Sequence, residues 1–191
     1  MLNIQGGSMH KEFLETFILV FIAEMGDKTQ LMLMTLAAKY TVIQMLAGIL
    51  LGVLLNHGTA VYIGCFISNL TEEYLLQLFA GIIFIIFGII TIVYEERDEK
   101  EKHYNLGPVI TTALTFFLGE MGDKTQLTCI TLSMDARYPL IVLAGSVAAM
   151  LSVGFVGIII GTSLTKYIPS YIIKTISGLI FIIFGIMRLI G

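Results

Sequence analysis

Six long apolar segments dominate this chain of 191 residues and leave few positions for a water-facing surface. They lie at residues 13–37, 42–68, 73–94, 107–133, 139–164 and 170–190. A helix that crosses about 30 Å of hydrocarbon needs about 20 residues, so each segment is long enough to span a bilayer. Short connections with turn residues and most of the charge separate them. The sequence therefore predicts an all-α integral membrane protein with six transmembrane helices.

The composition excludes the soluble alternatives. Hydrophobic residues make up 57% of the chain and charged residues 13%, whereas an ordinary soluble domain has about 25% charged residues. This is too little charge to cover a soluble surface or to keep a chain disordered. The formal net charge of −3 offers no basic surface for phosphates, so no nucleic-acid partner is expected. The lipid bilayer is the expected partner.

The two cysteines, Cys65 and Cys129, lie inside apolar segments and are predicted to be packing residues. They supply neither a disulfide framework nor a paired-cysteine metal motif. The first residues lack the basic start of a signal peptide. Gly-Gly-Ser before a second Met looks like a remnant of cloning, so residues 1–8 are set apart from the fold.

An internal repeat divides the chain into two halves. The heptapeptide EMGDKTQ at 24–30 recurs unchanged at 120–126, and GIIFIIFGI at 81–89 recurs as GLIFIIFGI at 178–186. The offset is 96 at the first motif and 97 at the second. The halves are residues 9–94 and 107–191, joined by a charged central loop at 95–106. Because each half has an odd number of spans, the second half must enter the membrane from the opposite side, which predicts the inverted-topology repeats of secondary transporters.

Lysine and arginine in the loops predict the orientation. With the central loop in the cytoplasm, that side collects Lys39, Arg97, Lys100, Lys102, Lys166 and Lys174. The other side collects Lys11, Arg137 and Arg188. The bias predicts a cytoplasmic central loop and both termini outside.

Each motif copy puts two carboxylates in the middle of an apolar span. Glu24 and Asp27 lie in the first span, and Glu120 and Asp123 lie in the fourth. A spacing of three residues places both carboxylates of a copy on one face of a continuous helix. Ionised carboxylates in hydrocarbon cost several kcal/mol each, so they should face a protein-lined cavity. All four are expected to meet where the two halves contact each other.

The ligand atoms of the two motifs are all hard oxygens, because neither copy contains His or Cys. Beyond the carboxylates, the candidate ligands are Thr29, Gln30, Thr125 and Gln126. Gly26 and Gly122 are expected to loosen the two helices and bare backbone carbonyls as further ligands. Oxygen ligands suit Ca²⁺, Mn²⁺ or Mg²⁺ rather than Zn²⁺ or Cu⁺.

The charges of the two motifs suggest how a metal and protons could compete. Four carboxylates and two lysines carry a charge of −2, which one divalent cation or two protons would neutralise. Crowded carboxylates raise one another's affinity for protons, so both ligands compete for the same oxygens. This competition is a minimal mechanism of antiport.

A structural alternative stands beside the metal site. Glu24 and Lys28, like Glu120 and Lys124, are four residues apart and could form helix-stabilising ion pairs. Such pairs contribute only about 0.2–0.5 kcal/mol, which does not offset burial in a membrane, and both aspartates would remain unpaired. The two lysines either supply counter-charge to the site or snorkel outward.

Asn56 and His57 lie midway along the second span, where the other half has Val153 and Gly154. With Asn56 beside it, His57 is either a proton relay, because imidazole titrates near neutral pH, or part of an interhelical hydrogen bond. Glycines also recur along the spans at Gly48, Gly52, Gly81, Gly88, Gly157, Gly161, Gly178 and Gly185. They predict faces for close helix packing, with surfaces that slide during transport as the alternative.

The two copies of Glu-x-Gly-Asp-Lys-Thr resemble the signature of the GDT-type cation exchanger family. This family includes the Golgi manganese/calcium exchanger, chloroplast relatives and bacterial manganese exporters. The resemblance covers residues 10–191, and it implies export of Mn²⁺ or Ca²⁺ from the cytosol with protons as counter-ions. The family's acidic motif residues correspond here to Glu24, Asp27, Glu120 and Asp123. The short chain looks like the bacterial branch, which implies Mn²⁺ efflux across a bacterial inner membrane.

Together these features predict a secondary transporter, not an enzyme, with the metal ion as cargo and no resident cofactor. Export of Mn²⁺, or of Ca²⁺, would exchange for H⁺ by alternating access at the four-carboxylate site. An exporter of a small cationic metabolite is the first alternative. A membrane metalloenzyme is the second, disfavoured because the carboxylates lie at mid-depth without a nucleophile–base pair. Assembly into a homo-oligomer is left open.

Overall fold

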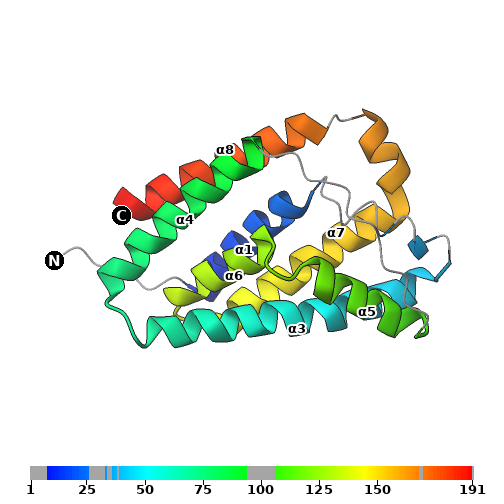
Figure 1. Ribbon diagram of the computed structural model, residues 1–191, viewed down its shortest axis with the longest axis horizontal. Coiled ribbons are helices and arrows are strands. Elements are labelled where there is room, and N and C mark those ends of the chain that lie inside the picture. Colours follow the sequence, from blue (N-terminus) through cyan, green and yellow to red (C-terminus); the bar gives the residue numbers. More distant parts are fainter. Residues whose placement is uncertain are drawn as a thin grey trace.

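The structure is a computed structural model that describes residues 8–25, 33, 36–37, 39–93, 106–167 and 170–190. These residues form seven helices and no strand, which confirms the predicted all-α class. The helices are α1 (Met9–Glu24), α3 (Val42–Ser68), α4 (Glu73–Val93), α5 (Pro108–Gly119), α6 (Lys124–Met134), α7 (Pro139–Tyr167) and α8 (Ser170–Ile190). Figure 1 shows them as a bundle in which the pair α4/α8 lies along one side and α3 and α5 along the other.

Four predicted spans coincide with single helices. The helix α3 has the predicted bounds, and α4, α7 and α8 begin at the predicted residues. Among the described residues, three helices are long and apolar enough to cross a membrane, namely Val42–Ser68, Tyr74–Val93 and Pro139–Ile159. Two shorter apolar helices, Pro108–Gly119 and Thr175–Ile190, accompany them.

The predicted span 107–133 is not one helix. The helix α5 ends at Gly119 and α6 begins at Lys124, so the second acidic motif lies at a break between two half-length helices. Gly122 within the break has φ of +78°, which the right-handed α-helix does not contain. The expectation that Glu120 and Asp123 share one face of a continuous helix was therefore wrong.

The first acidic motif also begins at a helix end. The helix α1 ends at Glu24, and Met25 after it is extended, with φ of −62° and ψ of 122°. Residues 26–32 lie outside the described residues. Both copies of the motif thus start where a helix in the middle of an apolar segment stops.

Local signals explain where the helices begin. Thr41 and Gln44 form a capping box at the start of α3, with each side chain bonded to the other residue's backbone N–H. The helix α5 begins at Pro108, a residue suited to the first helical position because it has no N–H to satisfy. Ser8 accepts a hydrogen bond from the backbone N–H of Lys11 and so caps α1. Ser8 therefore belongs to the fold, although the sequence placed it among the excluded residues 1–8.

Glycines bring α4 and α8 into close contact. A Cβ built on Gly81 would lie 2.9 Å from the carbonyl oxygen of Gly185, and one built on Gly88 would lie 2.5 Å from that of Gly178. The contacts run in opposite directions along the two helices, so α4 and α8 are antiparallel. They are also reciprocal, because Gly81 and Gly88 are the repeat counterparts of Gly178 and Gly185. The packing prediction for these glycines is confirmed.

The same correspondence holds for a second pair of contacts. A Cβ on Gly48 of α3 would meet the Cβ of Thr112 in α5 at 2.5 Å. A Cβ on Gly145 of α7 would meet the Cβ of Thr16 in α1 at 3.1 Å. Gly145 is the counterpart of Gly48, and Thr112 is the counterpart of Thr16. The contact of α3 with α5 and the contact of α7 with α1 thus involve corresponding residues of the two halves.

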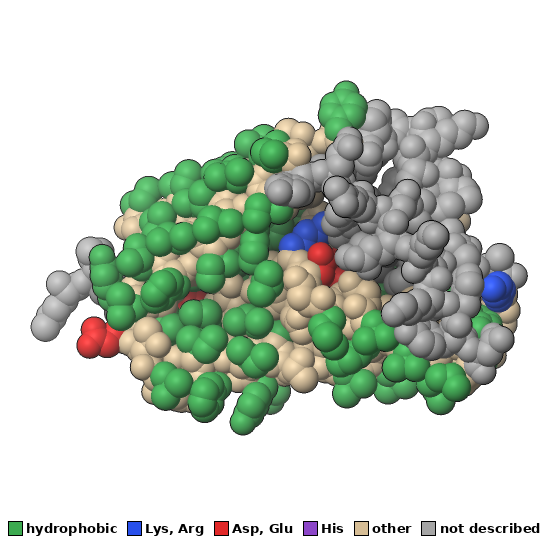
Figure 2. Space-filling view, viewed as in Figure 1, with side chains coloured by type: hydrophobic (Ala, Val, Ile, Leu, Met, Phe, Trp, Pro, Cys, Tyr) green, Lys and Arg blue, Asp and Glu red, His purple; other side chains and the backbone are tan. Residues whose placement is uncertain are grey.

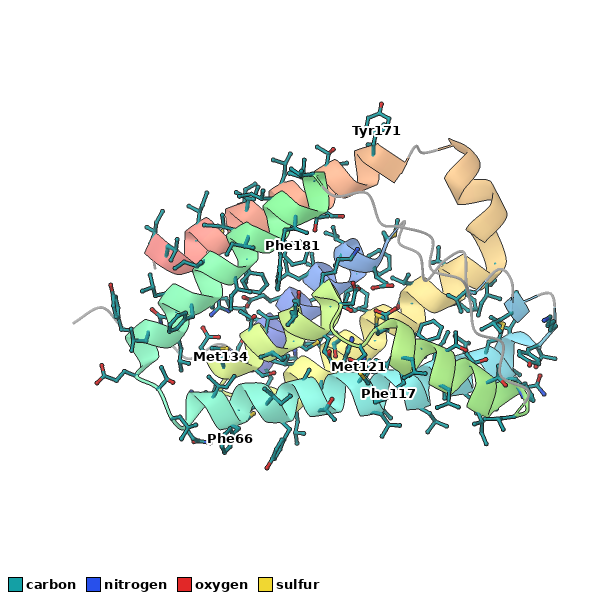
Figure 3. The ribbon with its side chains drawn as sticks, in the orientation of Figure 1. Phe66, Phe117, Met121, Met134, Tyr171 and Phe181 are labelled. Carbon is teal, nitrogen blue, oxygen red and sulfur yellow. The ribbon has the colours of Figure 1, made fainter. Side chains whose placement is uncertain are left out.

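The outside of the bundle is apolar. In Figure 2 hydrophobic side chains cover most of the visible surface over α4, α8 and α3. Many large hydrophobic residues are exposed, including Ile43, Tyr62, Leu140 and Ile190, each more than 70% accessible. Such a surface suits lipid rather than water. Aromatic rings fill the inside, where Phe84 packs against Phe181 and Phe184, and Figure 3 shows Phe181 beneath the α4/α8 pair.

Candidate cation site

Three motif carboxylates from the two halves meet at the centre of the bundle. One carboxylate oxygen each of Glu24, Glu120 and Asp123 lies within 4.8 Å of the other two. Glu24 and Glu120 are 0% and 1% exposed, and Asp123 is half-buried. Buried acidic groups this close together repel one another unless protons or a cation lie among them.

Helix ends contribute to the electrostatic field at this cluster. The carboxyl-terminal ends of α1 and α5 lie next to Glu24 and Glu120. The last turn of a helix leaves carbonyls without intrahelical partners and carries a partial negative charge, which favours a cation. Asp123 immediately precedes the first turn of α6, where the partial positive charge stabilises a carboxylate.

Side chains from neighbouring helices hold both of these helix ends. The Oγ of Ser177 in α8 donates a hydrogen bond of 2.8 Å to the carbonyl of Ile22 in the last turn of α1. The Nδ2 of Asn56 in α3 donates one of 3.2 Å to the carbonyl of Phe117 in the last turn of α5. Each bond satisfies a carbonyl near the point where its helix stops, so the ends of α1 and α5 are positioned by the bundle.

The side chain of Gln126 in α6 connects the break to α3. Its Oε1 accepts a hydrogen bond of 2.7 Å from the backbone N–H of Gly122, and its Nε2 donates one of 3.5 Å to the carbonyl of Asn56. The Oγ1 of Thr125 donates to Oε2 of Glu120 at 3.2 Å. Thr125 and Gln126 thus hold the residues of the break, and their predicted role as metal ligands stays a prediction. In Figure 3 the label Phe117 marks the last turn of α5, and the label Met121 marks the break itself.

The remaining predicted ligands belong to the first motif. Asp27, Lys28, Thr29 and Gln30 lie outside the described residues. Of the second motif's polar residues, Lys124 occupies the first position of α6 and is half-buried. Figure 2 shows red and blue atoms together near the middle of the visible face, between apolar side chains and grey atoms.

Asn56 and His57 have different surroundings. Asn56 is fully buried and donates an interhelical hydrogen bond to the carbonyl of Phe117, whereas the sequence had offered such a bond as the alternative role of His57. His57 is also fully buried, and neither ring nitrogen has a hydrogen-bond partner among the described residues. The relay role of His57 stays a prediction.

Three structural features had not been predicted from the sequence. They are the complete break of the fourth span, where the sequence predicted only a helix loosened at Gly122, the tie from Ser177 to α1, and the ion pairs of Arg188 with Glu15 and Asp135. The break had a local signal, because Gly122 followed by Asp123 combines a residue favoured after a helix with one favoured before the next. The two ties join residues far apart in the chain, which a single sequence does not reveal.

Comparison with known proteins places the chain in a family. The profile of the family described as "Divalent cation/proton antiporter GDT1" matches residues 12–99 and 108–191, which include both acidic motifs. No solved structure matches the chain.

Individual relatives agree with this match. A Vibrio cholerae protein named "Putative manganese exporter" is 27% identical, with 87% of this chain and 84% of that protein covered. A GDT1-like protein 5 of Arabidopsis thaliana is 26% identical over 96% of this chain and 97% of its own length. A GDT1-like protein of Schizosaccharomyces pombe is 36% identical over 47% of this chain and 34% of that protein. This chain belongs to the GDT1 family of divalent cation/proton antiporters, which are membrane transporters and not enzymes.

Proposed function

We propose that this chain exports Mn²⁺ from the cytosol in exchange for H⁺, with Ca²⁺ as an alternative cargo. The exchange takes place by alternating access at one mid-membrane site formed by Glu24, Asp27, Glu120 and Asp123. Support for Mn²⁺ comes from the hard oxygen ligands and from the Vibrio cholerae relative named as an exporter of this metal.

The observation that carries the proposal is the meeting of carboxylates from both halves within 4.8 Å. A hard cation holds its oxygen ligands at about 2.0–2.6 Å, so oxygens on opposite sides of one ion lie about 4–5 Å apart. The oxygens of Glu24, Glu120 and Asp123 are therefore close enough together to be ligands of a single ion. Asp27, the counterpart of Asp123, supplies the fourth carboxylate in this proposal.

Proton coupling follows from the same oxygens. A carboxylate binds a metal ion only when it is deprotonated, so each bound proton removes a ligand. A site that holds one divalent cation facing one side and protons facing the other exchanges the two without a separate proton path. His57 is then an accessory candidate for proton transfer rather than a requirement.

The glycine contacts support two inverted repeats. Counterpart helices α4 and α8 cross in opposite directions with reciprocal contacts, which a two-fold axis in the membrane plane would produce. In the proposed orientation the central loop is cytoplasmic, and Lys11, Arg137 and Arg188 lie at the outer end together with both termini. In Figure 1 the start of α1 and the end of α8 lie at the same end of the bundle.

Flux measurements in proteoliposomes test this function. Purified protein should move Mn²⁺ against its gradient when a pH gradient is imposed, and Asp123→Asn and Glu120→Gln should each abolish or severely slow this flux. Glu72→Gln is the matched control, because Glu72 is an exposed carboxylate beyond the end of α3. Full flux in both site variants, or flux that ignores the pH gradient, would contradict the proposal. Parallel assays with Ca²⁺ decide which cation is the better cargo.

A further inference from the structure

Three charged side chains form a cluster at one end of the bundle. The guanidinium of Arg188 in α8 lies 2.9 Å from Oε1 of Glu15 in α1, and its other nitrogen pairs with Oδ2 of Asp135. The same guanidinium lies 5.2 Å from the centre of the Phe184 ring. The side chains of Arg188, Glu15 and Asp135 are 22%, 18% and 13% exposed, so the cluster is mostly buried.

This cluster joins the helices that carry the candidate cation site. Glu15 belongs to α1, the helix that ends at Glu24. Asp135 directly follows α6, the helix that begins next to Asp123. Since α6 has 11 residues, the cluster lies about 16 Å from the site along that helix, which is about half the thickness of the hydrocarbon layer.

Glu15 and Arg188 have no charged counterparts in the other half of the repeat. At the offsets of the repeat, the counterpart of Glu15 is Thr111 and the counterpart of Arg188 is Thr91. Asp135 lies in the loop that has one residue more than its counterpart. The ion pairs therefore distinguish two ends that the repeat would otherwise make equivalent.

A second contact strengthens the same end. The carboxylate of Glu12 in α1 accepts hydrogen bonds of 3.0 Å from the backbone N–H groups of Arg137 and Tyr138, just before α7 begins. The counterpart of Glu12 is Pro108, which cannot accept such bonds through its side chain. At this end α1 is thus bound to α8 through Glu15 and to the residues just before α7 through Glu12, and Arg188 of α8 also binds Asp135 after α6.

We propose that Arg188, Glu15 and Asp135 form a latch that closes the path between the cation site and the end of the bundle where α1 begins and α8 ends. The inference rests on the proposed alternating access. In the closed state Arg188 holds α1 and the end of α6 against α8. To open this end, both ion pairs must separate, which lets water and the cation reach the site along α6.

The position of the latch suits repeated opening. Ion pairs at a partly wet surface exchange for water at small cost, whereas the same charges in mid-membrane would not. Arg188 is therefore a positioning residue for transport: its described contacts are with Glu15, Asp135 and Phe184 rather than with Glu24, Glu120 or Asp123, and it sets which side the site faces.

Labelling of a cysteine at Thr131 tests the latch without any transport. Thr131 is 2% exposed, lies one helical turn before Asp135 on the same face of α6, and bonds only within its own helix among the contacts described. In a background with Cys65→Ala and Cys129→Ala, Thr131→Cys is exposed to a water-soluble maleimide, and the rate of modification is measured. Arg188→Gln should raise this rate about tenfold, because the open state gains population when the pairs are lost.

Several variants separate the latch from a general loss of structure. Arg188→Lys keeps the charge and should label at a rate near that of the parent protein. Arg137→Gln is the matched control, because it removes a cation from the same end of the bundle. The Arg137 guanidinium lies 5.5 Å from the centre of the Tyr138 ring, and the labelling rate of this variant should stay within about twofold of the parent protein. Glu15→Gln combined with Asp135→Asn removes both partners and should reproduce the effect of Arg188→Gln, even if the latter variant does not fold.

The labelling assay involves no transport, so failure of the latch can be distinguished from failure of the proposed function. Unchanged labelling in both the Arg188→Gln and the double variant, or an equal rise in Arg137→Gln, would overturn the latch and leave the cation site intact. Mn²⁺ binding to the purified variants should stay within about threefold of the parent protein, while the maximal exchange rate falls. A loss of flux in the site variants bears only on the cation site, not on the latch.

Discussion

Single residues determine the geometry of the candidate site, and Gly122 shows this most directly. It has φ of +78° in the break between α5 and α6, and a Cβ built on it meets no atom within 4 Å. The need for glycine is therefore conformational and not a matter of space. A side chain at this φ costs about 1–2 kcal/mol, so the backbone would relax and move the acidic residues on either side.

Gly122→Ala should weaken Mn²⁺ binding about tenfold or more, because the strain is relieved by displacing Glu120 and Asp123. Gly58→Ala is the matched control, since Gly58 also has open space around its Cβ position but lies inside α3. That variant should bind like the parent protein. Titration calorimetry on both purified variants measures the difference, and equal affinities would show that the break tolerates other conformations.

Asn56 gives a second prediction at this scale. Asn56→Val installs the counterpart residue of the other half and leaves the carbonyl of Phe117 without its bond from Asn56. A buried group that loses its partner costs about 1–3 kcal/mol, so thermal stability and Mn²⁺ affinity should both fall. The flux–pH profile should keep its shape if Asn56 only positions the break. A changed profile would instead support a role in proton transfer.

At the scale of whole helices, the sequence predicted what local patterns determine. The bounds of α3 and the starts of α4, α7 and α8 follow from apolar length and flanking turn residues, and these agreed with the structure. The division of the fourth span into α5 and α6 was missed because apolar length does not report backbone direction. The pairing of Arg188 with Glu15 joins residues 173 positions apart, so no local pattern contains it.

The close packing of α4 on α8 leads to a prediction about thermal stability. Gly88→Ala places a Cβ 2.5 Å from the carbonyl oxygen of Gly178, a backbone atom that cannot rotate away. Overpacking of this sort costs about 1–3 kcal/mol and should lower the apparent melting temperature in detergent by about 5 °C. Gly58→Ala again serves as control and should melt at or slightly above the temperature of the parent protein, because alanine favours the helix and has open space there. If Gly88→Ala melts at the same temperature as the parent protein, α4 and α8 are less tightly packed than the structure shows.

For the molecule as a whole, the candidate site predicts how cation binding depends on pH. A metal ion binds deprotonated carboxylates, so protons compete and the affinity for Mn²⁺ should fall as the pH falls. If two protons leave for each ion, the decrease reaches about 100-fold per pH unit. Calorimetry between pH 6 and pH 8 measures the slope, and Asp123→Asn should reduce it. A pH-independent affinity would separate metal binding from proton transport.

The reciprocal contacts between α4 and α8 also bear on how such a molecule could arise. Gly81 contacts Gly185 and Gly88 contacts Gly178, so the two helices pack against each other through corresponding surfaces. A surface that complements itself in this way is what two separate, identical chains use to form a symmetric dimer. A single three-helix ancestor could therefore have paired with an oppositely inserted copy of itself. After a gene fusion, each copy would have been able to change independently. Arg188, whose counterpart in the first half is Thr91, is an example of such a change.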